Sequence, residues 1–401
     1  MLSEFREGFS NAYQTIYQKR SVAFDSVATR RFEKSLSYGQ TFKRVLPDIS
    51  NIRIRTNVNG TDNTIDTTAD TSETLTVNTD KVANFSIFDT EVVQAGPLQP
   101  GEYFGSEIGK KGAIYMDADI LYETLNAQQT FDTGDLTTQT SNGTPITLSS
   151  TTVPQMVAQA EAKLLAFNQD IEGLVWVVDP YSFSQVHQYI LGKEVDAAVA
   201  GLRNGYSGGT IGGAQVYISN NLTGTVKITY TGQPSNTETL VLARGGTSIT
   251  FTAVSSIGST AGNFLIGGDA DTTYTNLTAL INAPGTTNAN QVALSAANQL
   301  VVTDDWQLTA TQDTTGNTVT IVGKGASKLT ATDGLSNATL ISYVNSYFGK
   351  RGAVDVIQQY VPEMEKKRHP FQPADIVACH WFWGKKTYDD GKRKFLNVQI
   401  A

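Results

Sequence analysis

The stretch EYFGSEIGKKGAIYMDADILYETLNA, residues 102–127, determines how the rest of the chain is interpreted. Glu102 puts a negative charge into its first turn, where the helix dipole favours an anion. Four apolar residues recur at offsets of four, three and four, which is the period of one helix face: Ile114, Ala118, Leu121 and Leu125. We therefore predict one long helix over residues 102–127.

Another face of this predicted helix carries three glycines, Gly105, Gly109 and Gly112. Each glycine costs a helix about 1 kcal/mol relative to alanine. A helix with three glycines on one side is either bent there or closely approached by another backbone. The sequence leaves both alternatives open.

The composition describes a folded chain of 401 residues, long enough for two or three domains, with 40% hydrophobic and 17% charged residues. A net charge of −8 lacks the basic footprint of a nucleic-acid binder. Cys379 is the one cysteine, so no disulfide can form within the chain. Neither a signal peptide nor an apolar run of ~18–20 residues is found, so we expect a protein made and folded in a cytoplasm.

Upstream of the predicted helix, residues 51–95 have the pattern of an extended arm. Ile52 and Ile54 alternate with Arg53 and Arg55, and further alternating apolar residues follow after a polar, Thr-rich stretch. We predict a long two-stranded arm with a polar tip. A free hairpin is marginally stable in water, so this arm is expected to lie on something else.

The N-terminal 25 residues place aromatic side chains four apart, on one helical face: Phe5, Phe9, Tyr13 and Tyr17. This face packs on the subunit's own domain or forms an arm on a neighbouring subunit. The pattern does not separate these two alternatives.

Downstream, the signals of a compact α/β domain follow one another. An apolar stripe beginning at Val153 predicts a helix, and Leu174–Val178 is a continuous apolar run typical of a strand covered on both faces. Asp179-Pro180 starts a second helix, and Ala214–Ile218 is a second strand.

From about Thr223 to Asn337 the chain becomes Thr-, Ser-, Gly- and Asn-rich, and its short alternating runs predict a mostly β domain. The expected strands are VKITY, LVLA, SITFTAV, LVVT and VTIV, with one helix at Thr275–Ala283. The earlier composition then resumes with an expected helix at Leu340–Phe348 and three expected strands, Ala353–Val361, Asp375–Gly384 and the closing KFLNVQIA. Because one composition flanks the β domain on both sides, that domain is predicted to be an insertion.

No constellation of catalytic or metal-binding residues is found. The three histidines share no metal-ligand spacing. Cys379 and His380 are adjacent on a predicted strand and point to opposite faces, so they form no nucleophile–base pair, and the thiol is expected to be buried. We therefore nominate no catalytic residue, no metal ligand and no cofactor.

The order of arm, long helix, α/β core and C-terminal strands resembles the major capsid proteins of tailed bacteriophages, the Hong Kong ninety-seven type, in a podovirus-like form. The stretches that carry the resemblance are LVWVVDPYSFSQVHQYI, GGTIGGAQVYISNNL and RGAVDVIQQYVPEME. The resemblance covers most of the chain outside the β domain, and its motifs are patterns of order rather than an invariant signature.

The fold implied by this resemblance is α+β, with an N-arm, an extended β-loop, a spine helix, and peripheral and axial domains, to which a mostly β insertion domain is added. The implied divisions are 1–50, N-terminal arm and start of the peripheral domain; 51–95, extended loop; 96–150, peripheral domain with the spine helix; 151–222, axial domain; 223–339, inserted domain; and 340–401, return to the axial and peripheral domains with C-terminal strands.

The function implied by the resemblance is that of a major capsid protein without catalysis, which self-assembles into hexamers and pentamers of an icosahedral shell around double-stranded DNA. The implied partners are further copies of the chain, a separate scaffolding protein, a portal, a decoration protein, and packaged DNA held non-specifically, with no membrane. The implied location is the virion capsid, assembled in the host cytoplasm. A net negative charge suits such a container, because a basic lining would bind the packaged polyanion tightly.

The resemblance also implies which residues meet between subunits, since each extended loop would lie across a neighbour's spine helix. Candidates on the loop are Arg53, Arg55 and Lys81, and candidates on the helix are the three glycines and the acids Asp117, Asp119 and Glu123. The alternative functions are another virion component, such as a decoration, tail or baseplate protein, and, less favoured, a carbohydrate-binding or enzyme module.

Overall fold

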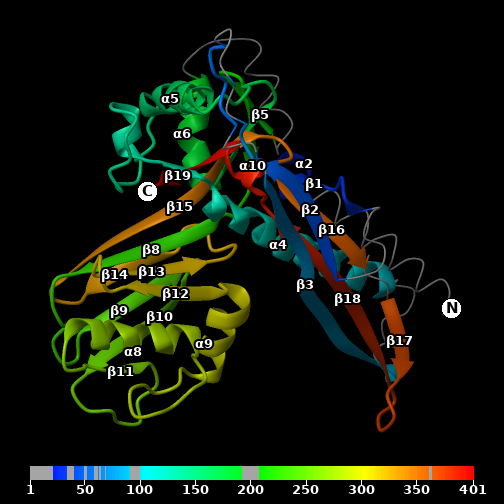
Figure 1. Cartoon of the computed structure of the whole chain (residues 1–401). Coiled ribbons are helices and arrows are strands. Elements are labelled where there is room, and N and C mark those ends of the chain that lie inside the picture. The colour runs from blue at the N-terminus through cyan, green and yellow to red at the C-terminus, as the bar shows by residue number, and fades with distance from the viewer. Residues whose placement is uncertain are drawn as a thin grey trace. The chain divides into compact units, whose positions relative to one another are not determined.

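The computed structural model describes residues 21–33, 40–48, 52–57, 62, 65–67, 69–90, 100–191, 207–360 and 364–401 (Figure 1). The aromatic pattern predicted for the N-terminal residues therefore lies outside the described part of the chain. The chain divides into two compact units. Among the described residues, unit 1 comprises Thr29–Ile108 and Val354–Tyr388, and unit 2 comprises 21–28, Gly109–Ala353 and Asp389–Ala401.

Unit 1 is built on a six-stranded sheet of order β1-β16-β18-β3-β2, with β17 paired to β18. The strands are β1 (Ala28–Thr29), β2 (Thr41–Asp48), β3 (Ala69–Phe88), β16 (Val354–Tyr360), β17 (Met364–Arg368) and β18 (Ala374–Lys386). The strands predicted at Ala353–Val361 and Asp375–Gly384 are thereby confirmed as β16 and β18. β17 was missed, because its sequence MEKKR has the composition of a solvated segment and becomes a strand by pairing with β18.

β3 is 20 residues long and has two partners in succession. Its first part, residues 69–76, pairs with β2, and residues 77–88 pair with β18, beside which it runs in Figure 1. The strand expected at Ile52–Arg55 is wrong, since residues 52–57 form neither helix nor strand. A strand needs a partner, and the partners of β3 come from outside residues 51–95.

β18 buries one face of its pleat and leaves the other partly exposed. Val377, Cys379, Trp381 and Trp383 alternate along the strand, and each is buried. The expectation that Cys379 is a buried thiol is confirmed, and burial raises its pKa to about 12.

This burial predicts an unreactive thiol. In the native chain at pH 8, Cys379 should react with a disulfide reagent such as Ellman's reagent at least about 100-fold more slowly than in guanidinium, because the reactive thiolate is scarce and enclosed. Time-resolved absorbance measures both rates. Equal rates would show that the β18 face opens readily in solution.

The predicted long helix is confirmed as α4 (Pro100–Tyr122), which continues as a 3₁₀ turn, η2 (Glu123–Asn126). Pro100 and Gly101 lie in its first turn, so the helix begins two residues before the predicted start. Proline fits this turn because the first backbone N–H groups of a helix have no intrahelical acceptor. From Met116 to Leu121 every residue is buried, so the helix is covered on all sides there and not along a single stripe.

Unit 2 contains a nine-stranded sheet of order β12-β13-β8-β15-β5-β7-β6, extended by β19 and β4. Its strands are β4 (Gln129–Phe131), β5 (Leu174–Val178), β6 (Ser207–Ile211), β7 (Ala214–Ile218), β8 (Thr223–Tyr230), β12 (Leu308–Asp313), β13 (Thr318–Gly323), β15 (Ala338–Lys350) and β19 (Phe395–Ile400). The strands predicted at Leu174–Val178 and Ala214–Ile218 are confirmed and run parallel to each other.

Helices α5 (Thr152–Ala166) and α6 (Pro180–Leu191) pack with β5, β7 and β19 around one hydrophobic core. All five residues of β5 are buried, as its continuous apolar run predicts. Asp179 begins α6: its Oδ2 atom accepts hydrogen bonds from the backbone N–H groups of Tyr181 (3.0 Å) and Ser182 (3.3 Å). This cap explains the sharp turn from strand to helix at Asp179-Pro180.

The helix predicted at Leu340–Phe348 is wrong, because this segment is part of strand β15. Its apolar residues have spacings of three and four that mimic a helix, but residues 344–349 are buried on both faces of a central strand. Along one edge β15 pairs first with β8 and then with β5, while β19 takes the opposite edge. One strand therefore joins the predicted β domain to the α/β core.

The rest of the predicted β domain is a second, four-stranded sheet of order β11-β10-β9-β14 packed with helix α8. Its elements are β9 (Thr239–Arg244), β10 (Thr247–Val254), β11 (Asn263–Leu265), α8 (Ala270–Asn282) and β14 (Thr330–Gly334). The strand expected at LVVT is wrong, because this segment lies in α9 (Ala296–Leu300) and the π turn η4 (Val301–Asp305). Ser295 caps α9 by accepting a hydrogen bond from Asn298 N, a local preference that outweighs the β-branched run.

Candidate functional site

The three acids predicted to lie on the helix surface are buried, and each has a partner inside the subunit. Asp117 is fully enclosed and accepts hydrogen bonds from the hydroxyl of Ser21 (2.6 Å) and from the backbone N–H groups of Val22 (2.8 Å) and Ala23 (3.2 Å). These N–H groups open the short helix α2 (Ala23–Ser26), so the carboxylate of Asp117 acts as its cap from another part of the chain.

Asp119 faces the loop that follows β13. Its Oδ1 atom lies 3.1 Å from Nζ of Lys324, and the same ammonium lies 4.7 Å from the ring centre of Tyr122 on α4. The next residue, Gly325, has φ = +60°, and a Cβ atom there would lie 2.8 Å from that of Ala118. This loop, residues 323–326, is therefore fitted tightly onto α4.

Glu123, the third acid, accepts a hydrogen bond from the side chain of Asn126 at 2.8 Å and is also buried. Of the three glycines, Gly109 is buried in α4, Gly112 is partly exposed, and Gly105 lies in the same helix. No close approach of a backbone to these glycines is described, so their contact with a neighbouring copy stays a prediction.

The remaining candidates belong to the segment that was predicted to be an extended loop. Arg55 forms a two-bonded ion pair with Asp66, with both N···O distances 2.7 Å, and the backbone N–H of Arg53 donates to the same carboxylate at 2.9 Å. The hydrogen bond from Arg55, followed by that from Arg53, lowers the pKa of Asp66 to about 2. The carboxylate therefore stays ionised at neutral pH and keeps the two sides of the loop joined.

Lys81 lies on β3, opposite Trp381 of β18, and its side chain is exposed. The structure thus brings Arg53 and Arg55 together at Asp66, while the described partners of the three acids all lie in unit 2. A contact between the basic residues of the loop and the three acids on the helix of a neighbouring copy stays a prediction. The three acids already have hydrogen-bond or ion-pair partners within their own subunit.

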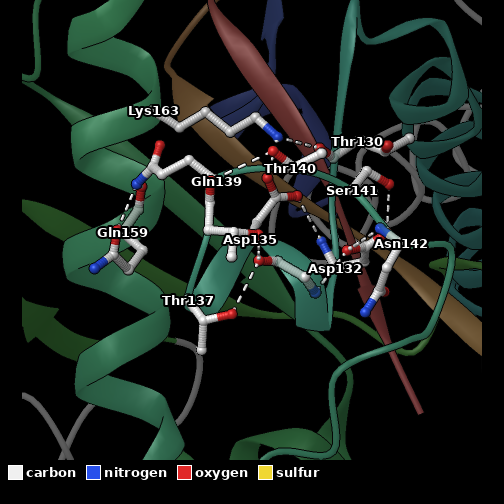
Figure 2. Close-up of polar contacts among 12 residues, drawn as sticks. Thr130, Asp132, Asp135, Thr137, Gln139, Thr140, Ser141, Asn142, Gln159 and Lys163 are labelled. Atoms are coloured by element: carbon white, nitrogen blue, oxygen red, sulfur yellow. Dashed lines mark hydrogen bonds and ion pairs between the residues drawn. The ribbon is translucent and has the colours of Figure 1, made fainter.

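A buried polar cluster that sequence reasoning missed lies between β4 and α5 (Figure 2). Lys163 donates to Asp135 (2.6 Å) and to the carbonyl of Thr130 (2.8 Å), and Asp132 accepts from Gly143 N (2.7 Å) and from the hydroxyl of Ser141. Burial acts to raise the pKa of Asp132, but the hydrogen bonds it accepts outweigh burial and lower the pKa.

This cluster comprises Asp132, Asp135, Ser141, Asn142, Gly143 and Lys163. Every charged group in it is hydrogen-bonded, so the cluster fixes the loop after β4. A sequence signal was present in Ser141-Asn142-Gly143, a typical turn sequence, which donates hydrogen bonds to Asp132. Lys163, the partner of Asp135, lies 28 residues further along the chain and left no local signal.

Among the described residues, no group of acids, histidines and cysteine could hold a metal ion. In the same part of the chain, no helix combines the length and the apolar character needed to cross a membrane.

No protein-family model matches the sequence, and no curated protein matches it. Solved structures are similar to it. The capsid structure of Cyanophage P-SCSP1u has a TM-score of 0.48 and 10% identity, covering 94% of this chain and 86% of that chain. The asymmetric unit of the bacteriophage PhiM1 mature capsid has a TM-score of 0.45 and 9% identity, covering 90% of this chain and 82% of that chain. These two are phage capsids.

A structure from Mycobacterium phage Che8 has a TM-score of 0.48 and 14% identity, covering 92% of this chain and 88% of that chain. The sequence identities of the three structures with this chain are 9–14%.

Proposed function

We propose that this chain is a virion shell subunit, a major capsid protein of the tailed-phage type, whose function is self-assembly. The observation that carries the proposal is the extended loop, which presents apolar side chains to solvent. Ile54 is fully exposed, Ile65 is 91% exposed and Ile52 is 47% exposed. Exposed apolar side chains gathered on one segment mark a surface that another molecule covers.

An ion pair also restrains the conformation of the loop, which favours such a contact. Arg55 and Asp66 join its two sides, so the isoleucines near each end are presented together. A loop that is ordered before it binds loses less conformational entropy on binding. An exposed ion pair adds little stability by itself, so the value of this one lies in fixing the geometry of the loop.

In this proposal the loop packs on a neighbouring copy, and repetition of that contact builds hexamers and pentamers of an icosahedral shell around double-stranded DNA. The proposed partners are other copies of the chain, a separate scaffolding protein, a portal and a decoration protein, and the proposed location is the capsid, assembled in the host cytoplasm. The chain's net charge of −8 supports a container whose wall binds its DNA weakly. We propose no catalytic activity.

The proposal predicts that polar residues at the loop isoleucines prevent assembly and leave the subunit folded. The double variant Ile54→Ser, Ile65→Ser should raise the concentration needed for assembly by at least roughly 100-fold, because each buried isoleucine contributes about 1.5–3 kcal/mol to a contact and the two losses add. Light scattering and electron microscopy of the chain co-expressed with a phage scaffolding protein measure this change.

The matched control is Thr56→Ser, which changes an exposed loop residue without removing a large apolar side chain. Its particles should match those of the wild type. Normal closed shells from the double isoleucine variant would show that the loop makes no apolar contact. Tubes from the wild-type chain would favour a tail component, and dispersed monomers would contradict the shell function itself.

A further inference from the structure

The connection between β13 and β14, residues 324–329, contacts two helices that are far apart in the sequence. At its start, Lys324 places its ammonium 3.1 Å from Oδ1 of Asp119 on α4. Near its end, Lys328 places its ammonium 5.2 Å from the ring centre of Tyr181, the second residue of α6. An ammonium in this position is attracted to the aromatic ring. One short connection therefore makes a cationic contact with α4 and another with α6.

The backbone between these two lysines is held in place. Lys328 has φ = +62°, a left-handed conformation that a residue other than glycine keeps only where its surroundings hold it. The hydroxyl of Ser327 donates to the carbonyl of Asn220, two residues after β7, at 2.7 Å. Nε of Arg244 on β9 donates to the carbonyl of Ser327 at 3.3 Å. The β13–β14 connection is thus fixed in its middle as well as at both ends.

The same connection is part of a hydrophobic core. Ala326 and Leu329 are buried in the core that the four-stranded sheet shares with β8, β12 and β13. A Cβ atom added at Gly224 on β8 would lie 2.1 Å from the carbonyl oxygen of Ala326, so no side chain fits between them. Interiors packed this closely transmit a displacement. A shift of the β13–β14 connection would therefore disturb the core behind it.

A movement of α4 relative to α6 would break one of the two lysine contacts. Asp119 is buried, so its ion pair with Lys324 acts in a site poor in water, where separating the two charges is costly. Tyr181 is exposed, and the contact that Lys328 makes with it is the weaker of the two. Because both contacts start from one rigid segment, neither helix can shift alone without losing its contact.

We propose that residues 324–329 form a brace that couples α4 to α6, so that the two helices keep one relative position while subunits assemble. The inference rests on the proposed shell function and deepens it by naming what restrains the shape of the subunit. A closed shell of one diameter requires its subunits to present their contacts within a narrow range of angles. The brace supplies this restraint through two lysine side chains that single substitutions can remove.

The first test measures the coupling in unassembled subunits of the full chain by amide hydrogen exchange and mass spectrometry. Lys324→Met should speed exchange at least about threefold in α4 and also at the start of α6, where no contact of Lys324 is described. Lys328→Met should produce the converse, with faster exchange at residues 116–122 of α4. Faster exchange confined to the helix next to each substitution overturns the inference.

The matched control is Lys227→Met on β8, a half-buried lysine that alternates with the core residues of its strand. It should leave exchange in both helices unchanged. Strand β5 reports the stability of the whole unit and should exchange as in the wild type in all three variants. An equal acceleration in β5 would show a general loss of stability in place of a specific coupling, and would also overturn the inference.

The second test follows the brace into the shell, with the chain co-expressed with a phage scaffolding protein. In electron micrographs, the double variant Lys324→Met, Lys328→Met should give particles with a wider spread of diameters than the wild type, and Lys227→Met should match the wild type. A spread equal to that of the wild type overturns the inference. Failure of the wild-type chain to assemble would instead contradict the proposed function, while the exchange experiment on subunits still decides the coupling, so the two failures are distinguishable.

Discussion

Replacing Asp117 by alanine is expected to lower the free energy of unfolding by about 3 kcal/mol or more. The carboxylate is fully buried and accepts hydrogen bonds from one hydroxyl and two backbone N–H groups, those of Ser21, Val22 and Ala23. Alanine would leave these donors without an acceptor, and each unsatisfied buried donor costs about 1–3 kcal/mol. Urea unfolding of the unassembled subunit, followed by circular dichroism, measures the change.

A graded series separates this effect from a change in helix propensity. Asp117→Asn keeps one acceptor oxygen and should cost less than alanine, because it retains part of the cap of α2. Lys111→Ala, at an exposed position of the same helix, is the control and should change the unfolding free energy by less than about 0.5 kcal/mol. A small decrease in the free energy of unfolding for Asp117→Ala would mean that water replaces the carboxylate and that the start of α2 is open in solution.

The second large effect is expected for Gly325→Val, which should lower the free energy of unfolding by about 3 kcal/mol in total. Two costs add at this position. The backbone has φ = +60°, which strains a β-branched residue, and a Cβ atom would lie 2.8 Å from that of Ala118 on α4. Moving the loop to relieve the contact would also pull Lys324 away from the buried Asp119.

The chain offers a matched control for this change. Gly245 has φ = +57° and no atom within 4 Å of the added Cβ, so Gly245→Val reports the backbone strain alone. Gly245→Val should lower the free energy of unfolding by about 1–2 kcal/mol. The additional decrease found for Gly325→Val then measures the close fit of the loop to α4. The double variant Gly325→Val, Ala118→Gly should recover part of that remainder. Equal losses at Gly245 and Gly325 would contradict the tight fit.

The Gly325→Val variant concerns a connection between α4 and the predicted inserted domain that the sequence did not indicate. The boundaries 223–339 stay a prediction, but the first strand of that range, β8, pairs with β15, which continues into the α/β core. Residues 323–326 also rest on α4. The predicted insertion is thus joined to the rest of unit 2 by a shared sheet and by a fitted loop.

Elements with strong local signals were predicted well. β5 has a five-residue apolar run, α6 begins with Asp179-Pro180, and α4 has an apolar period with an acidic first turn. In each case the residues that specify the element lie within it or next to it. Two segments whose structure depends on a partner were missed, since β15 was predicted as a helix and β17 was not predicted as a strand. Residues 300–303 were predicted as a strand, although the local cap at Ser295 favours a helix there.

At the candidate site, too, the interactions that were missed are those between residues far apart in the chain. The resemblance implied that Asp117, Asp119 and Glu123 meet the loop of a neighbouring copy, so these acids were expected on an accessible face of the helix. Two of the partners exist but are far away in the chain: Ser21 lies 96 residues from Asp117, and Lys324 lies 205 residues from Asp119. Neither pairing leaves a trace in the local pattern.

The sequence by itself determined the long helix, the covered strand Leu174–Val178 and its cap, the chain of β signals after Thr223, and the absence of a disulfide within the chain. Periodicity, capping and turn chemistry act over a few residues, so they can be seen in the sequence. Only the tertiary structure decided that the helix acids face inward and that β15 joins two parts of one sheet. Burial and pairing depend on residues brought together from distant parts of the chain, and their energies exceed local preferences.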